Sequence, residues 1–149
     1  MGFLTGTVTF ERFRIEEDPT GAFGESHIKK LEKNRIGAFE TNLFEQPDVG
    51  FIGGAHLLDA DFSIEKNIIG EAMHFGIRVD SVAVPSSIKN AWMQIELAPF
   101  LVDNPGGKPS KAQKQEAKDA VDAKCAAEAD QGNFKRMAET SVLLSLIHI

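Results

Sequence analysis

Apolar side chains alternate with small or polar ones along residues 67–80, NIIGEAMHFGIRVD. The apolar set is Met73, Phe75, Ile77 and Val79, and the set between them is Ala72, His74, Gly76 and Arg78. Successive side chains of a strand point to opposite faces, so this pattern predicts a half-buried strand. The chain must therefore fold around a sheet that has one buried face.

Further strands and helices follow from similar patterns. Segments rich in β-branched and aromatic residues predict strands at 3–15, 49–52, 56–62 and 134–142, the first with a change of parity near Glu11. Amphipathic or helix-favouring segments predict helices at 25–36, from Pro85 to a stop or kink at Pro99, and at 111–130. This order indicates an α+β fold with an antiparallel or mixed sheet, one short helix and two longer helices.

The segment 111–130 is an unusually polar helix. Ser110 provides an N-cap, Gly132 provides a stop, and the residues between are mostly Ala, Lys, Glu, Gln and Asp. Its only sizeable apolar side chains are Val121 and Cys125, and Cys125 is expected to be a packing thiol rather than a nucleophile. Such a helix buries little by itself, so we expect other parts of a longer chain to support it or a partner to dock on it.

Length and composition bound the class of protein. The 149 residues suffice for one domain, and a single cysteine cannot form an internal disulfide. The N-terminus lacks the pattern of a signal peptide, and no window is apolar enough to predict a membrane span. These features favour a cytoplasmic protein, with no membrane partner and no cofactor expected.

The last residues, from Leu144 to Ile149 (LSLIHI), read like the translation of a sequencing-library adapter. We therefore expect residues 1–143 to be the N-terminal part of a longer domain, and residues 144–149 to be foreign to it. The alternative is a genuine apolar strand that closes the domain.

Positive charge is concentrated in one third of an acidic chain. The net charge is −6, but residues 104–136 hold seven Lys or Arg against five Asp or Glu, while the other residues hold nine against seventeen. On an ideal helix Lys111, Lys114 and Lys118 fall within about 60° of arc, so their amines could contact successive phosphates. The ordinary alternative is a solvated face, balanced by acidic neighbours through pairs such as Lys118 with Asp122.

Two other groups of polar residues are weaker candidates for sites. His56, Asp59 and Asp61 are metal-ligand types, but turn carboxylates are the expected interpretation, and Glu65 does not complete a nuclease-type cluster. His74 lies on the polar parity of its strand and is expected to be an ordinary surface histidine. The glycines match no phosphate-binding loop.

One order of motifs is similar to a known family. A strand that ends in Arg leads through Pro85 to a helix in residues 76–95 (GIRVDSVAVPSSIKNAWMQI), followed by the connector GGKP and by SKAQKQEAKDAVDAKC. This order, together with the opening MGFLTGTVTFERFRI, resembles the N-terminal half of the RdgC-like, recombination-associated DNA-binding proteins. Residues 37–66 match that pattern less well.

The resemblance implies a bacterial, nucleoid-associated protein that binds duplex DNA with little sequence preference. It further implies a homodimeric ring in the full-length protein, which limits access of recombination proteins to DNA. The residues expected to contact DNA are Lys108, Lys111, Lys114, Lys118, Lys135 and Arg136. An exonuclease activity has been ascribed to the family, but no catalytic or metal-binding residues are expected here. The alternatives are a metal-dependent exonuclease, or a protein-interaction or structural domain without a nucleic-acid role.

Overall fold

The computed structural model of the chain describes residues 9–15 and 21–146. They divide into two compact units. The first, here the sheet unit, comprises Met1–Thr41, Asp48–Val79 and Met137–Ile149. The second, here the hairpin unit, comprises Asn42–Pro47 and Asp80–Arg136.

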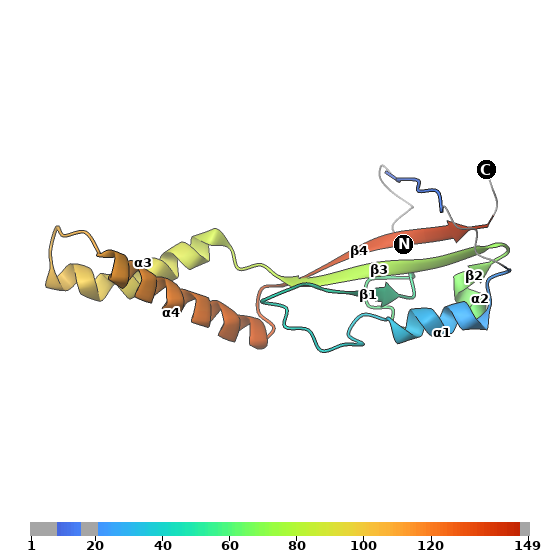
Figure 1. The fold of residues 1–149 in the computed structure, drawn as a ribbon, viewed down its shortest axis with the longest axis horizontal. Coiled ribbons are helices and arrows are strands. Elements are labelled where there is room, and N and C mark those ends of the chain that lie inside the picture. Colours follow the sequence, from blue (N-terminus) through green and yellow to red (C-terminus); the bar gives the residue numbers. More distant parts are fainter. Residues whose placement is uncertain (1–8, 16–20, 147–149) are drawn as a thin grey trace. The chain divides into compact units, whose positions relative to one another are not determined.

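The described elements run in the order α1, β1, α2, β2, β3, α3, α4 and β4 (Figure 1). Their bounds are α1 Glu25–Lys33, β1 Asp48–Ile52, α2 Ile64–Asn67, β2 Ile68–Ile69, β3 Ala72–Val82, α3 Ser86–Asp103, α4 Lys111–Asp130 and β4 Lys135–Ser145. The strands form an open antiparallel sheet in which β1, β2 and β4 all neighbour β3. The predicted α+β class is therefore confirmed.

The core of the sheet unit lies where α1 meets the apolar face of β3. Leu31 of α1 packs with Met73 and Phe75, and all three side chains are buried. Half-buried side chains complete this cluster: Phe23, Phe51, Phe62, Ile68, Ile77, Val142 and Leu144. The side chains of Met73, Phe75 and Ile77, which pack in this cluster, are those that the alternation predicts to be buried. Farther along β3 the alternation fails, because Val79 is only half-buried and Asp80, of the opposite parity, is buried.

A buried asparagine joins three segments of the sheet unit. Asn67 is fully buried at the end of α2, and its side-chain amide donates to the carbonyls of Gly53 (2.9 Å) and His74 (2.8 Å). Its Oδ1 accepts from the backbone N–H of Ser63 at 3.0 Å. Buried polar groups require such partners, and each bond of Asn67 fixes a different piece of chain.

The region before β3 departs from the prediction in two places. The expected strand at 56–62 is wrong: this segment is a turn, in which the N–H of Asp59 donates to the carbonyl of His56 at 2.9 Å. The expected strand at 67–80 begins later, because Gly70 adopts a positive φ of 62° and closes a tight hairpin between β2 and β3. Of the strand expected at 3–15, residues 9–15 have no regular structure and the rest lies outside the described residues.

The hairpin unit consists mainly of α3 and α4, which pack against each other. The α4 bounds coincide with the predicted 111–130. Ser110 Oγ accepts from the N–H of Gln113 at 3.2 Å, and Gln113 Oε1 accepts from the N–H of Ser110 at 2.9 Å. This reciprocal capping explains why the helix begins there.

The contact between α3 and α4 is made by small side chains of α4. Ala117, Val121 and Cys125 are the buried residues of α4 and are spaced one turn apart. The role of Cys125 as a packing thiol is thus confirmed, since its side chain is fully buried.

Pro99 does not end α3, which continues to Asp103. The apolar side chains of this helix are only partly covered, because no residue of α3 is buried and Ile95 is 62% exposed. The missing N–H of Pro99 removes one helical hydrogen bond, and that loss occurs on a water-accessible helix. None of the described helices is long and apolar enough to cross a membrane.

Candidate nucleic-acid interface

The lysines of α4 lie on the solvent side of the hairpin unit. Lys111, Lys114 and Lys118 are all exposed, and none of them forms an ion pair with another described residue. In particular, the i,i+4 pair that could have neutralised Lys118 through Asp122 does not form. None of the three ammonium groups is therefore neutralised by a direct ion pair with a described carboxylate.

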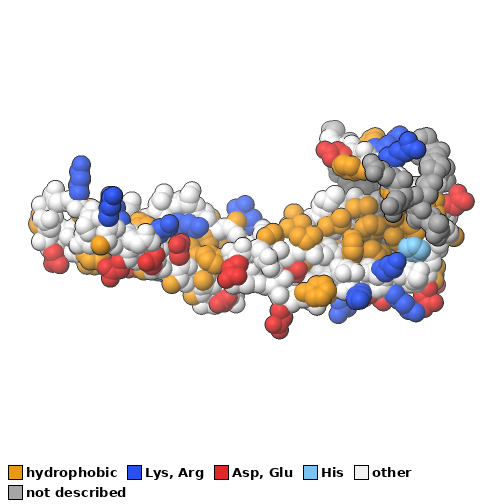
Figure 2. All heavy atoms as spheres, viewed as in Figure 1, with side chains coloured by type: hydrophobic (Ala, Val, Ile, Leu, Met, Phe, Trp, Pro, Cys, Tyr) orange, Lys and Arg blue, Asp and Glu red, His pale blue; other side chains and the backbone are white. Residues whose placement is uncertain are grey.

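Most acidic side chains of the hairpin unit gather on a different edge, whereas Asp122, one turn beyond Lys118, projects only about 40° from it on an ideal helix. Figure 2 shows Lys and Arg side chains along one edge of the α3–α4 hairpin and Asp and Glu side chains along the opposite edge. Asp119 is held by a hydrogen bond from Gln115 Nε2 at 2.8 Å rather than by a lysine. On an ideal helix Glu116 projects at least about 140° from each of the three lysines. This segregation creates a positive edge, here called the lysine edge, which consists of Lys111, Lys114 and Lys118.

The connector before α4 adds one cation. Lys108 is exposed in the segment that precedes the Ser110 cap. Gly106 in the same connector has a positive φ of 80°, which glycine adopts without strain. The connector thus turns tightly, and Lys108 lies three residues before Lys111, the first lysine of the lysine edge.

The two basic residues after α4 differ from each other. The Nζ of Lys135 lies 3.0 Å from Oδ2 of Asp80, whose side chain is only 4% exposed. Lys135 therefore compensates a buried carboxylate within the hairpin unit, an interaction that the sequence did not predict. Arg136 is exposed and takes part in no ion pair among the described residues.

A further cation of α4 contacts an aromatic ring. Lys124 Nζ lies 5.1 Å from the centroid of the Trp92 ring, a cation–π distance, and Trp92 also meets Phe134 edge-on. Lys124 is thus engaged with α3 and is not part of the lysine edge.

The candidate metal ligands form a structural network instead. Asp59 is buried and accepts hydrogen bonds from the N–H groups of Ala55 and Asp61, and it also pairs with Lys66. Burial raises the pKa of Asp59, but the hydrogen bonds from Lys66 and the backbone outweigh burial, so the pKa lies below its ordinary value. Within residues 9–15 and 21–146, no three His, Cys, Asp or Glu side chains are arranged to hold a metal ion.

His56 also serves the turn. Its Nδ1 accepts from the backbone N–H of Leu58 at 3.2 Å, and with Asp59 it holds the segment in a turn conformation. The expectation of turn carboxylates is therefore confirmed for Asp59, which accepts hydrogen bonds from the N–H groups of Ala55 and Asp61.

In comparison with known proteins, no family model matches this chain. No curated protein sequence matches it either.

Proposed function

We propose that this chain is part of a nucleoid-associated protein that binds duplex DNA through the phosphate backbone and thereby modulates recombination. The proposal includes assembly of the full-length protein into a homodimer that surrounds the duplex. The observation that supports it is the lysine edge: an acidic protein displays three exposed, unpaired ammonium groups along one side of a helix.

The chemistry of the lysine edge suits backbone binding rather than base recognition. Lys111 and Lys118 are seven residues apart, which is about 10 Å along a helix axis. Ammonium groups at that spacing contact phosphates as point charges and carry no sequence information. Each phosphate neutralised by a lysine releases counterions, so such binding weakens steeply as salt is added.

A charge-reversed variant tests the role of the lysine edge. The double change Lys111→Glu with Lys114→Glu should weaken binding to a labelled duplex in fluorescence anisotropy at low salt. It should also reduce the slope of log affinity against log salt by about 2, roughly one for each phosphate that a lysine no longer neutralises. Affinity that is unchanged in this variant would contradict the proposal.

A matched control separates local charge from net charge. The double change Glu116→Lys with Asp119→Lys alters net charge by the same amount in the opposite sense, at positions of the same helix that project about 80° or more from each of the three lysines. We expect this control to change affinity much less than the lysine variant does. Equal and opposite effects of the two variants would mean that overall charge, not the lysine edge, governs binding.

A second candidate function is a protein-interaction domain. Exposed apolar side chains on α3 favour it, since Ile95 is 62% exposed and Val102 is 74% exposed. This candidate predicts no duplex binding at low salt, and a loss of partner binding on Ile95→Ser with Val102→Ser. The duplex-binding proposal predicts that DNA affinity survives those changes.

A further inference from the structure

A shallow depression of about 710 Å³ lies on the sheet unit, beside the end of α1. Lys29, Lys33 and Arg35 line one side of it, and Asp61 and Phe62 line the other. This depression belongs to residues that play no part in the lysine edge, so it is a separate candidate site.

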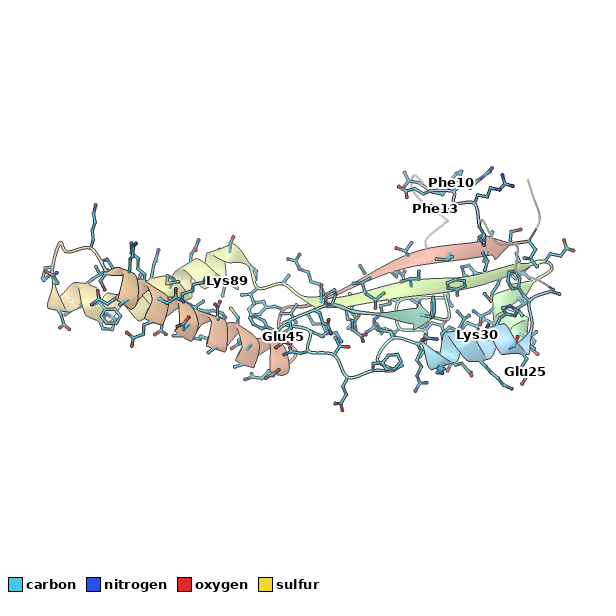
Figure 3. All side chains as sticks on the ribbon, in the orientation of Figure 1. Phe10, Phe13, Glu25, Lys30, Glu45 and Lys89 are labelled. Carbon is cyan, nitrogen blue, oxygen red and sulfur yellow. The ribbon has the colours of Figure 1, made fainter. Side chains whose placement is uncertain are left out.

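The basic side of the depression carries free positive charge. Lys33 and Arg35 are exposed and form no ion pair with another described residue, whereas Lys29 pairs with Glu25 at 2.8 Å. Glu32, on the same helix as Lys29 and Lys33, and Asp61 also line the depression and contribute negative charge. Figure 3 marks Glu25 and Lys30 on α1, and Lys30 is exposed.

Backbone hydrogen bonds hold Arg35 in place. The N–H of Ile36 donates to the carbonyl of Phe51, and the N–H of Phe51 donates to the carbonyl of Asn34, both at 3.0 Å. Arg35 is thus tied to β1 from both sides. Gly50 permits this approach, since a Cβ there would lie within 2.7 Å of the backbone of Arg35 and Ile36.

The opposite side is fixed by the network around Asp59. The N–H of Asp61 donates to Asp59 at 3.2 Å, and Lys66 Nζ donates to the carbonyl of Asp61 at 2.8 Å. A Cβ at Gly53 would collide with both Asp61 and Lys66, so a glycine is required there too. The backbone of both segments is therefore positioned before any ligand arrives, so a ligand has to order only the exposed side chains.

The geometry points to a second phosphate-binding surface, on which Lys33 and Arg35 bind the backbone phosphates of a nucleic-acid strand. An extended polyanion fits better than a free phosphate ion, because the depression is open and the exposed lysines of α1 offer contacts for more than one phosphate. Lys29, Lys30 and Lys33 fall within about 100° of arc on an ideal helix, on the side away from the core residues Ile28 and Leu31. The inference rests on the proposed function only in its choice of nucleic acid as the ligand.

The test is the double change Lys33→Glu with Arg35→Glu in the full chain, measured by anisotropy with a labelled duplex over a salt series. We expect a several-fold loss of affinity and a salt slope reduced by about 2. The matched control is Arg12→Glu with Arg14→Glu, an identical charge change on exposed residues of the same unit. The control should leave affinity close to that of the unchanged protein.

The two proposals fail in different ways. If the Lys111/Lys114 variant loses binding while the Lys33/Arg35 variant matches the Arg12/Arg14 control, the second surface is overturned and the lysine edge stands. If only the Lys33/Arg35 variant loses binding, the second surface stands and the lysine edge is overturned. If the unchanged chain binds no DNA at low salt, both are overturned.

A second measurement guards against a folding artefact. A short oligonucleotide titrated into the ¹⁵N-labelled, unchanged chain should shift the amide resonances of Lys33, Asn34 and Arg35. Shifts confined to residues outside residues 29–38 and 60–62 would overturn the inference.

Discussion

The sheet unit and the hairpin unit bury different kinds of side chain. The sheet unit packs Leu31, Met73 and Phe75 in one cluster and adds a fully buried, fully bonded asparagine. The hairpin unit buries Ala117, Val121 and Cys125 and leaves large apolar side chains of α3 exposed. Because burial of apolar area drives folding, the sheet unit should resist local opening more strongly than the hairpin unit.

Core truncations test whether the sheet unit is more stable than the hairpin unit. They should change the free energy of unfolding more than the other substitutions do. Leu31→Ala should lower the free energy of unfolding of the sheet unit by about 3 kcal/mol, since it leaves a cavity in a tight cluster. Val121→Ala removes less apolar surface and should cost the hairpin unit about 1.5 kcal/mol. Hydrogen exchange of β3 amides reports the first, and urea unfolding followed by Trp92 fluorescence reports the second.

Trp92 is the only tryptophan in the chain and belongs to α3, so its fluorescence reports the hairpin unit directly. If Leu31→Ala lowers β3 protection and the Trp92 transition equally, the two units unfold as one and the comparison fails. A larger loss in β3 protection than in the Trp92 transition supports it.

The cap of α4 provides a smaller test of the hairpin unit. Ser110→Ala removes the hydroxyl that accepts from the N–H of Gln113 and should cost about 1 kcal/mol. Ser110→Asp keeps an acceptor at the same position and should retain most of the stability. Unchanged Trp92 unfolding in Ser110→Ala would show that packing against α3, not the cap, decides where α4 begins.

Acidification should destabilise the sheet unit through Asp59, and this is the smallest of the expected effects. The folded-state pKa of Asp59 lies below its ordinary value of 3.8, so its ionised form stabilises the sheet unit above that value. This stabilisation is lost as the pH falls below 3.8 and through the lower folded-state pKa. Asp59→Asn should therefore show a weaker loss of β3 protection on acidification than the unchanged chain, and identical pH profiles would contradict this assignment.

Several elements could be predicted because their signals are local. The bounds of α4 follow from a capping serine, a helix-favouring composition and a terminal glycine. The burial of Met73 and Phe75 in the first half of β3 follows from the alternation, whereas the burial of Asp80 does not. The exposure of Lys111 and Lys118 could not be predicted, because on an ideal helix Lys118 projects only about 20° from the buried Cys125. Their freedom from ion pairs also required the structure.

Other features depend on interactions between distant residues and have no local signal. The segment 56–62 has strand-like composition, but the Asp59 side chain bonds backbone N–H groups in a turn and so competes with strand pairing. The ion pair of Lys135 with Asp80 joins separate parts of the chain. The basic depression depends on Gly50 lying directly against Ile36, and no sequence pattern indicates that approach. Gly70 does offer a local signal for the β2–β3 hairpin, which the apolar run around it obscures.

The exposure of two phenylalanines in residues 9–15 is a further feature that the sequence did not predict. Phe10 and Phe13 are each 82% exposed, and Figure 3 shows both on the extended segment that carries them. Their apolar character predicts burial in a strand, but the described part of that segment forms no ladder with β1, β2, β3 or β4.

The full burial of Cys125 makes the opening of the hairpin observable without any substitution. The chain contains a single thiol, and that thiol is shielded as long as α4 stays packed on α3. A thiol-specific reagent can therefore react only with molecules whose helices have separated, so the rate of labelling reports the population of open hairpins. A bound duplex that rigidifies α4 would slow this reaction. The labelling rate of Cys125 thus reports the separation of α4 from α3.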